Sequence, residues 1–193
     1  MNGITPFELH LTTHKISGKK NDDFTALCSE IGGKSLLIEL AQGEFMQQPM
    51  FTTTIFEKDL EAVLRMARSL AQRFRDSEFP IQRIKVETEE IYSDNFEKLP
   101  ENYFEWHGKI NIKNFPNLFE ICQKHKVHLS KNSLKDEPNL RFITLRESCS
   151  KEVYQKRLAK LLDDLDLEKI IKQESEFCVY DNNLILDKGW LPE

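Results

Sequence analysis

The sequence predicts an α+β protein in which one unit, strand–helix–strand–strand–helix–strand, occurs twice. Three observations support this prediction. Several segments alternate apolar and polar residues, two long segments show the helical period, and short stretches of similar sequence recur in the same order in both halves. The chain has 193 residues, of which 39% are hydrophobic, and its 13 phenylalanines are enough to form a packed core.

The first half contains the signals of six elements. Phe7, Leu9 and Leu11 alternate with polar residues, which predicts a strand. Polar residues 21–23 can cap a short helix, and the two glycines at 32–33 end it. The expected elements are a strand at residues 7–13, a helix from 21 to 31, strands at 35–40 and 50–56, an amphipathic helix at 58–75 and a strand at 81–88.

The second half repeats this order. Its expected elements are a strand at residues 103–112, a helix at 115–124, strands at 127–130 and 140–147, a helix at 151–165 and a strand at 170–180. Residues 7–10 (Phe-Glu-Leu-His) match residues 104–107 (Phe-Glu-Trp-His), and Leu-Cys at 27–28 matches Ile-Cys at 121–122. Aligning residues 50–51 with 141–142 also places Thr53 opposite Thr144. Matches in a constant order indicate an internal duplication.

The repeated unit is the ferredoxin-like arrangement, in which an antiparallel sheet of four strands carries both helices on one face. We therefore expect tandem duplicated lobes: residues 1–90 form the first, 91–102 a polar linker, and 103–193 the second with a C-terminal extension. The extension contains Leu184, Ile185, Leu186 and Trp190, and we expect it to pack against a lobe because a tryptophan is seldom left in water.

Composition narrows the classes of partner. The net charge is −5 and no basic block is present, which argues against a nucleic-acid partner. No apolar run approaches the roughly 20 residues of a membrane helix, and the N-terminus lacks a signal peptide, so we expect a cytoplasmic protein. The four cysteines form no CxxC pair, which argues against a disulfide scaffold or a thiolate zinc site.

Strand alternation assigns a set of polar residues to the sheet face that the helices leave open. The ligand-binding candidates on or beside this face are His10, Arg83, Lys85, Glu105, His107, Arg141 and Arg146. Three interpretations fit this pattern. The faces are simply solvated, or the two faces pack together around His10 and His107, or the charged residues form a site for an anion.

A short motif suggests an alternative. His10-Leu11-Thr12 and His128-Leu129-Ser130 both fit the pattern His-x-Thr/Ser. This pattern resembles that of the two-histidine phosphoesterases, a bilobal family with one such element in each lobe. The resemblance implies that His10 and His128 act as general acid and base on a phosphodiester, while Thr12 and Ser130 bind its oxygens. The chain departs from the internal repeat here, because the residue equivalent to His10 is His107.

Our leading hypothesis is a non-catalytic binding module that holds a small anionic ligand, or a protein partner, on its polar sheet faces. The alternative is a phosphoesterase of the two-histidine type. No glycine-rich phosphate loop, metal-binding motif or serine-nucleophile elbow is visible, so we expect no cofactor and no metal. The identity of the ligand, the oligomeric state and the pathway are not determined by the sequence.

Overall fold

The computed structural model describes residues 3–112, 114–134, 137–165 and 170–189, and both halves show the predicted order of elements. The first half contains β1 (Thr5–Thr13), α1 (Lys19–Glu30), β2 (Lys34–Leu40), β3 (Gln47–Glu57), α2 (Leu60–Asp76) and β4 (Ile81–Glu89). The second contains β5 (Tyr103–Asn111), α3 (Phe115–His125), β6 (His128–Asn132), β7 (Leu140–Glu147), α4 (Lys151–Asp164) and β8 (Ile170–Asp181). The prediction of an α+β fold with duplicated βαββαβ units is therefore confirmed.

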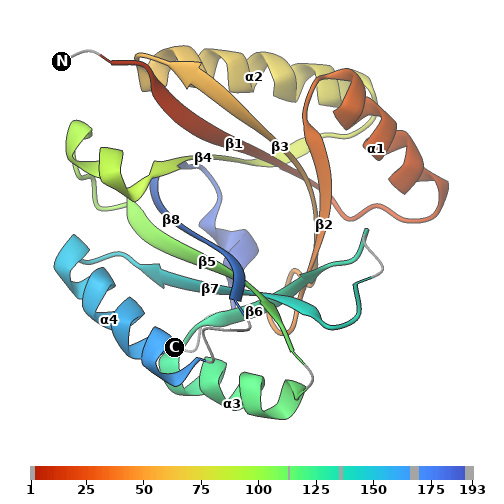
Figure 1. The fold of residues 1–193 in the computed structure, drawn as a ribbon. Coiled ribbons are helices and arrows are strands. Elements are labelled where there is room, and N and C mark those ends of the chain that lie inside the picture. Colours follow the sequence, from red (N-terminus) through yellow and green to blue (C-terminus); the bar gives the residue numbers. More distant parts are fainter. Residues whose placement is uncertain (1–2, 113, 135–136, 166–169, 190–193) are drawn as a thin grey trace.

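The two sheets join at both edges into one closed antiparallel barrel, with the strand order β1-β3-β2-β6-β7-β5-β8-β4 (Figure 1). The halves meet where β4 pairs with β8, as in Val86 with Tyr180, and where β2 pairs with β6, as in Leu40 with Ser130. We had expected two sheets, each with an open face. Closure instead removes the exposed edges and turns both faces into one interior.

The hydrophobic core lies between the barrel and its helices. Helices α1 and α2 lie on one side of the barrel, and α3 and α4 lie on the opposite side (Figure 1). The apolar residues of β1, such as Leu9, point outward and are fully buried against α2 residues such as Phe74. In the second half, Phe104 stacks on Tyr154 of α4 at a ring distance of 5.3 Å. The polar residues of the same strands must therefore point into the barrel.

Helix caps fix the starts of the long helices. The side chain of Asp59 accepts a hydrogen bond from the Ala62 amide and begins α2, and Ser150 caps α4 in the same way. The predicted cap at residues 21–23 is wrong, because α1 begins two residues earlier at Lys19. Its N-cap is Gly18, whose φ of 60° suits glycine.

Strand register corrects one detail of the repeat. His10 pairs with Thr52 across β1 and β3, whereas His107 pairs with Thr144 across β5 and β7. The structural equivalent of Thr144 is therefore Thr52, and the sequence alignment, which chose Thr53, was one residue out of register.

The segments outside the repeat also pack on the barrel. The predicted linker begins within a 3₁₀ helix, η1 (Glu90–Asn95), in which Ser93 is fully buried. The C-terminal extension forms the 3₁₀ helix η3 (Leu184–Asp187); Leu186 is buried and its carbonyl accepts a hydrogen bond from Gln48. Trp190 lies outside the described residues.

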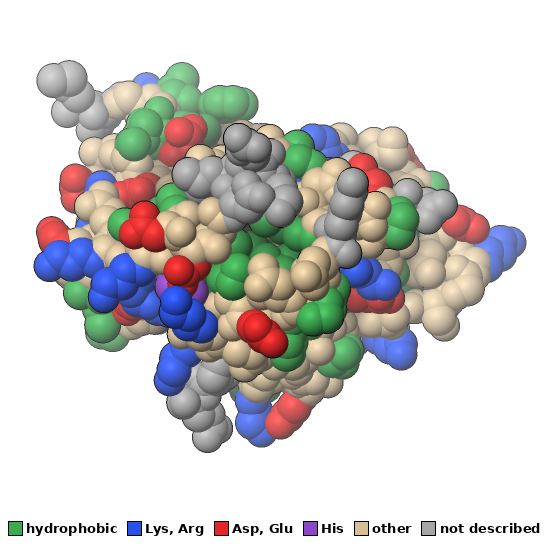
Figure 2. All heavy atoms as spheres, turned by 60° about the horizontal axis from the view of Figure 1, so that its bottom comes forward, with side chains coloured by type: hydrophobic (Ala, Val, Ile, Leu, Met, Phe, Trp, Pro, Cys, Tyr) green, Lys and Arg blue, Asp and Glu red, His purple; other side chains and the backbone are tan. Residues whose placement is uncertain are grey.

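The surface carries both signs of charge. Figure 2 shows one face of the molecule, on which basic and acidic side chains are interspersed. This mixture does not favour a polyanionic partner on that face. None of the described helices is both long and apolar enough to cross a membrane.

Candidate functional site

A cavity of about 260 Å³ lies inside the barrel. Its wall is made by residues of all eight strands and of η3. In the ring of strands, β2 and β8 are four positions apart, and so are β6 and β4, so these pairs face each other across the interior. The two opposite walls differ in character, and this difference defines the site.

One side of the cavity carries its apolar residues. They are Leu36, Ile38 and Leu40 of β2, Met50 of β3 and Phe142 of β7, and β6, between β2 and β7, adds the polar His128, Ser130 and Asn132. Across from β2 lie Lys172, Glu174 and Glu176 of β8. A cavity with one apolar and one charged wall can hold a small amphipathic molecule in a fixed orientation.

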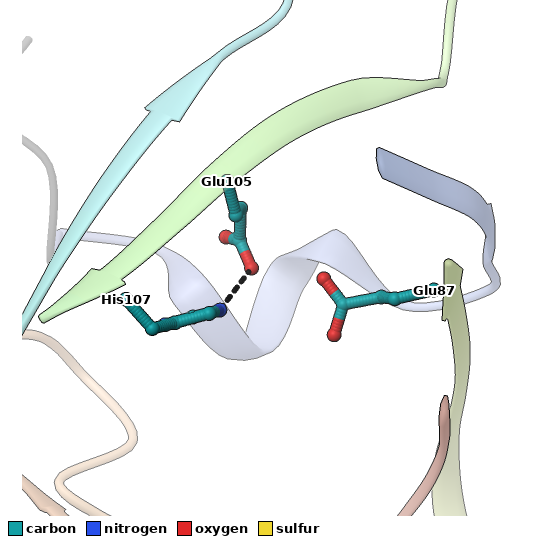
Figure 3. Close-up of side chains that lie close together, drawn as sticks. All are labelled: Glu87, Glu105 and His107. Atoms are coloured by element: carbon teal, nitrogen blue, oxygen red, sulfur yellow. Dashed lines mark ion pairs between the residues drawn. The ribbon is translucent and has the colours of Figure 1, made fainter. Parts of the chain in front are cut away.

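A buried ion cluster lies on the charged wall. Lys85 of β4 lies between two carboxylates, with Nζ 2.8 Å from Oε1 of Glu87 and 2.5 Å from Oε2 of Glu105. His107 is the next residue after Glu105 on β5 that points into the barrel. Its Nε2 is 3.3 Å from Oε2 of Glu105 and 3.3 Å from Oε2 of Glu176. Figure 3 shows Glu87, Glu105 and His107 pointing toward one another from β4 and β5.

The same cluster reaches β1. Nε2 of His10 is 3.0 Å from Oε2 of Glu87 and 3.7 Å from Oε1 of Glu8. Nδ1 of His10 is buried and has no hydrogen-bond partner among the described residues. A buried polar atom of this kind is available for a bound molecule, because an unsatisfied group costs free energy.

The cluster shifts the pKa values of its members. Burial alone would lower the pKa of His107, but hydrogen bonds to Glu105 and Glu176 raise it to about 10. The pKa of His10 is also raised, because Glu87 outweighs the effect of burial. Burial would raise the pKa of Glu105, yet the charges of Arg146 and Lys85 hold it well below its usual value. These shifts favour the charged forms of His107, His10 and Glu105.

A second group of charges converges on one carboxylate. Arg83 of β4 donates to both carboxylate oxygens of Asp187 at 2.9 and 2.8 Å, and Arg146 of β7 donates to Oδ2 of Asp187 at 2.8 Å. Asp187 belongs to η3, so the C-terminal extension places its carboxylate inside the barrel. Arg83 also pairs with Asp181, and Arg146 with Glu105. The arginines of the two halves thus build a site that binds a carboxylate.

His128 lines the same cavity as His10, together with Thr12 and Ser130. All three are buried, with exposures of 1%, 1% and 6% for His128, Thr12 and Ser130. Burial lowers the pKa of the His128 imidazole to about 4, which keeps it neutral at neutral pH. The four residues of the two His-x-Thr/Ser motifs therefore share one cavity.

The structure brings together most of the residues predicted from the sequence. The cavity wall includes His10, Arg83, Lys85, Glu105, His107 and Arg146. Arg141 is not part of it, because its neighbour Phe142 points inward and alternation turns Arg141 outward, where it bonds the carbonyls of Pro138 and Leu140. The interpretation as solvated faces is wrong, since residues such as Glu105 and Glu87 are fully buried.

Two parts of the site were missed from the sequence. The apolar wall of β2 comes from a continuous run, Leu36 to Ile38, and such a run indicates a strand that is covered on both faces. Asp187 lies in a segment with no distinguishing pattern, and only tertiary structure brings it to Arg83 and Arg146.

An acidic vestibule adjoins the cavity. This second cavity of about 470 Å³ is lined in part by Glu8, Glu89, Glu90, Glu174 and Glu176. Its described lining contains no lysine, arginine or histidine. Two of these glutamates have basic partners that do not line the vestibule: Glu174 pairs with Lys172, and Glu90 pairs with Lys151. Glu8, Glu174 and Glu176 also line the barrel cavity, so the two spaces are neighbours.

Comparisons with known proteins give only distant similarity. No model of a known protein family matches the chain, and no curated protein matches it. The acetolactate synthase small subunit from Thermotoga maritima is 11% identical over 92% of this chain and 96% of that one, with a TM-score of 0.31. A Fusobacterium nucleatum protein described provisionally as a monooxygenase is 13% identical over 99% and 98%, with a TM-score of 0.36. These values are too low to assign a function.

Proposed function

We propose that the protein is a binding module whose barrel holds a small amphipathic anion, such as a carboxylate with a short apolar body. The observation that carries this proposal is the contrast between the two walls of the cavity. Leu36, Ile38 and Phe142 offer an apolar surface, and the opposite wall offers fixed charges and a buried imidazole nitrogen of His10. Pockets with mostly apolar walls and a few placed polar groups are typical of small-molecule sites.

Arg83 and Arg146 are the proposed anchor for the anionic group. Both already bind the carboxylate of Asp187, so their geometry suits a carboxylate. The ligand's anionic group would take the place of Asp187 between them. A protein partner, which the sequence also allowed, would not reach these residues, because they lie inside the barrel.

A titration with matched small molecules tests the proposal. Isothermal titration of the full chain with hexanoate should show saturable binding, and the neutral hexanamide should bind more weakly because it lacks the charge that Arg83 and Arg146 recognise. Hexylamine serves as the cationic control. Equal binding of hexanoate and hexanamide, or a preference for hexylamine, would refute an anionic ligand. Absence of binding by all three would refute a small-molecule site of this size.

A phosphoesterase is the second candidate, and one observation favours it. His10, Thr12, His128 and Ser130 come from two halves of the chain and line a single cavity. Two imidazoles that act as general acid and base on one phosphate must share such a space, and this supports the candidate.

Cleavage of bis(p-nitrophenyl) phosphate and of a 2′,3′-cyclic nucleotide tests this candidate. If it is right, His10→Ala and His128→Ala each lower the rate by about 10²–10⁴, the usual contribution of an acid or base. His125→Ala is the control, because His125 pairs with Asp164 outside the barrel. No cleavage by the wild-type chain would leave the binding module as the only candidate.

A further inference from the structure

We propose that the edge of strand β8 beside the acidic vestibule binds an extended peptide segment that alternates basic and apolar residues. Strand β4 pairs with β8 only between Glu176 and Asp181, whereas β5 pairs with β8 from Ile170 to Cys178. On the side away from β5, none of the described residues pairs with residues 172–175. The closure of the barrel is therefore incomplete along this stretch. This inference does not depend on the anion proposed above.

An unpaired stretch of strand exposes backbone amide and carbonyl groups that a further strand can bind. Residues 172–174 are exposed, and the unpaired stretch spans about 13 Å. Extended peptides add to such edges through backbone hydrogen bonds, and their alternate side chains provide specificity. The other seam differs, because the amide of Leu37 on β2 donates to the side chain of Asn132 and its carbonyl accepts from the amide of Ser133.

The vestibule lies where β4 ends, between β8 and β1. Its lining combines residues 173–176 of β8 with Pro6 of β1, the end of β4, and Glu90 and Ile91 of η1. Glu90 is held toward α4, since its carboxylate accepts a hydrogen bond from Gln155. The volume of about 470 Å³ is in the range of ligand-binding pockets. The edge of β8 therefore borders a space that can receive a peptide.

The charges and the alternation of β8 indicate which peptide fits. The five glutamates of the vestibule are joined by no lysine, arginine or histidine in its described lining. Glu174 and Glu176 also line the barrel cavity, so they point inward, whereas Ser175 points outward and bonds Tyr154 of α4. An added strand would present its side chains in the same alternation, with every second one beside the glutamates. Ile91, which is 70% exposed, offers a contact to the apolar residues of the peptide.

A second copy of this chain fits the edge less well. Two β8 edges paired about a twofold axis would bring two acidic vestibules together, and like charges placed opposite each other destabilise a sheet. The net charge of −5 adds to this repulsion. A basic segment of a different protein has neither disadvantage.

Fluorescence anisotropy of the labelled peptide Lys-Val-Lys-Val-Lys-Val, titrated with the full chain, is the first experiment. We expect saturable binding that weakens as salt is raised, and no binding of the peptide Glu-Val-Glu-Val-Glu-Val. The double variant Glu89→Gln and Glu90→Gln should weaken binding about 2–30-fold, the combined effect of two exposed ion pairs. Neither residue lines the barrel cavity, so hexanoate binding should not change. Glu61→Gln, on the exposed face of α2, is the matched control and should leave the peptide affinity unchanged.

Two N-methylated forms of the basic peptide test strand addition itself. One carries methyl groups on the amides of its lysines and the other on those of its valines, so each form blocks one edge of the extended peptide. At least one form should bind about tenfold more weakly or worse, because it cannot donate hydrogen bonds to β8. Hydrogen exchange should show that the unmodified peptide protects amides within residues 172–175.

Several results would overturn the proposal. They are the absence of saturable binding by the basic peptide, equal binding of the basic and acidic peptides, and unchanged affinity of both methylated forms. Protection confined to other residues would place the peptide elsewhere. Dimerisation of the wild-type chain with protection of residues 172–175 in the absence of peptide would assign the edge to a second copy instead. Circular dichroism checks that the variants fold, and the peptide comparisons need only the wild-type chain.

Discussion

Arg83 and Arg146 come from different halves of the chain and bind the same carboxylate, that of Asp187. The pair links β4 to β7 through the C-terminal segment inside the barrel. The two halves of the internal duplication therefore form one site together, and neither half contains this site alone. This relationship explains why the predicted charged residues lie together, and it leads to the first prediction.

Asp187→Asn should destabilise the protein and strengthen anion binding. Loss of the carboxylate removes one partner from each of two buried guanidinium groups. Because Arg83 keeps Asp181 and Arg146 keeps Glu105, the cost should stay below the roughly 3–5 kcal/mol of a buried charge left unpaired. The same loss frees the arginines for a ligand, so hexanoate should bind more tightly and raise the midpoint of thermal unfolding. Urea unfolding and calorimetry measure both effects.

Glu30→Gln is the matched control for this variant. Glu30 pairs with Arg73 on the surface, where both side chains are well exposed. Breaking that pair should cost at most about 1 kcal/mol and should not change hexanoate binding. If Asp187→Asn behaved like Glu30→Gln, the account of the arginine pair would be wrong.

The closed barrel predicts one unfolding transition. Strands β4 and β8 pair over five residue positions, and β2 and β6 over three, so the halves share backbone hydrogen bonds as well as the ion cluster. Fluorescence and circular dichroism should therefore report coincident unfolding curves in urea. Two separate transitions would instead indicate independent lobes.

The thiols should differ sharply in reactivity. Cys28, Cys122 and Cys178 are buried, and burial raises the pKa of Cys28 and of Cys122 to about 12, whereas Cys149 is exposed. A thiol reagent should label one cysteine rapidly in the native protein and all four in denaturant. Rapid labelling of Cys28 or Cys122 would contradict the packing of α1 and α3.

The buried His128 should make the protein less stable in mild acid. Its pKa is about 4 in the folded chain and 6.5 when unperturbed, so the unfolded chain binds a proton first as the pH falls. The resulting loss of stability should begin near pH 6.5, reach up to about 1.4 kcal/mol per pH unit and end near pH 4.

His128→Asn should remove this part of the pH dependence, and urea unfolding at pH 7, 6 and 5 measures it. Burial is the largest cause of the shift, and the charges of Asp187, Arg146, Glu105 and His107 modify it. Because other groups titrate in both proteins, the difference between wild type and variant is the relevant quantity. Identical pH profiles would show that His128 is not held neutral.

Much of the fold was predictable from local pattern, and the site was predictable in part. Alternation in β1 and β5 placed His10 and His107 on one face each, and the structure confirms that both line the cavity. Barrel closure was not predictable, because pairing between β2 and β6 and between β4 and β8 is a tertiary choice that leaves no local signal. The prediction for Arg141 was wrong because its apolar neighbour Phe142 points into the cavity, so that alternation along β7 turns Arg141 outward.

The central claim is that the polar faces enclose a cavity that binds a small amphipathic anion. Backbone amide shifts of the isotope-labelled full chain during a hexanoate titration test it most directly. The account predicts saturable shifts at Leu36, Ile38 and Leu40 of β2 and at residues beside Arg83 and Arg146, with one dissociation constant. Shifts confined to surface residues, or no saturable shift at all, would contradict it.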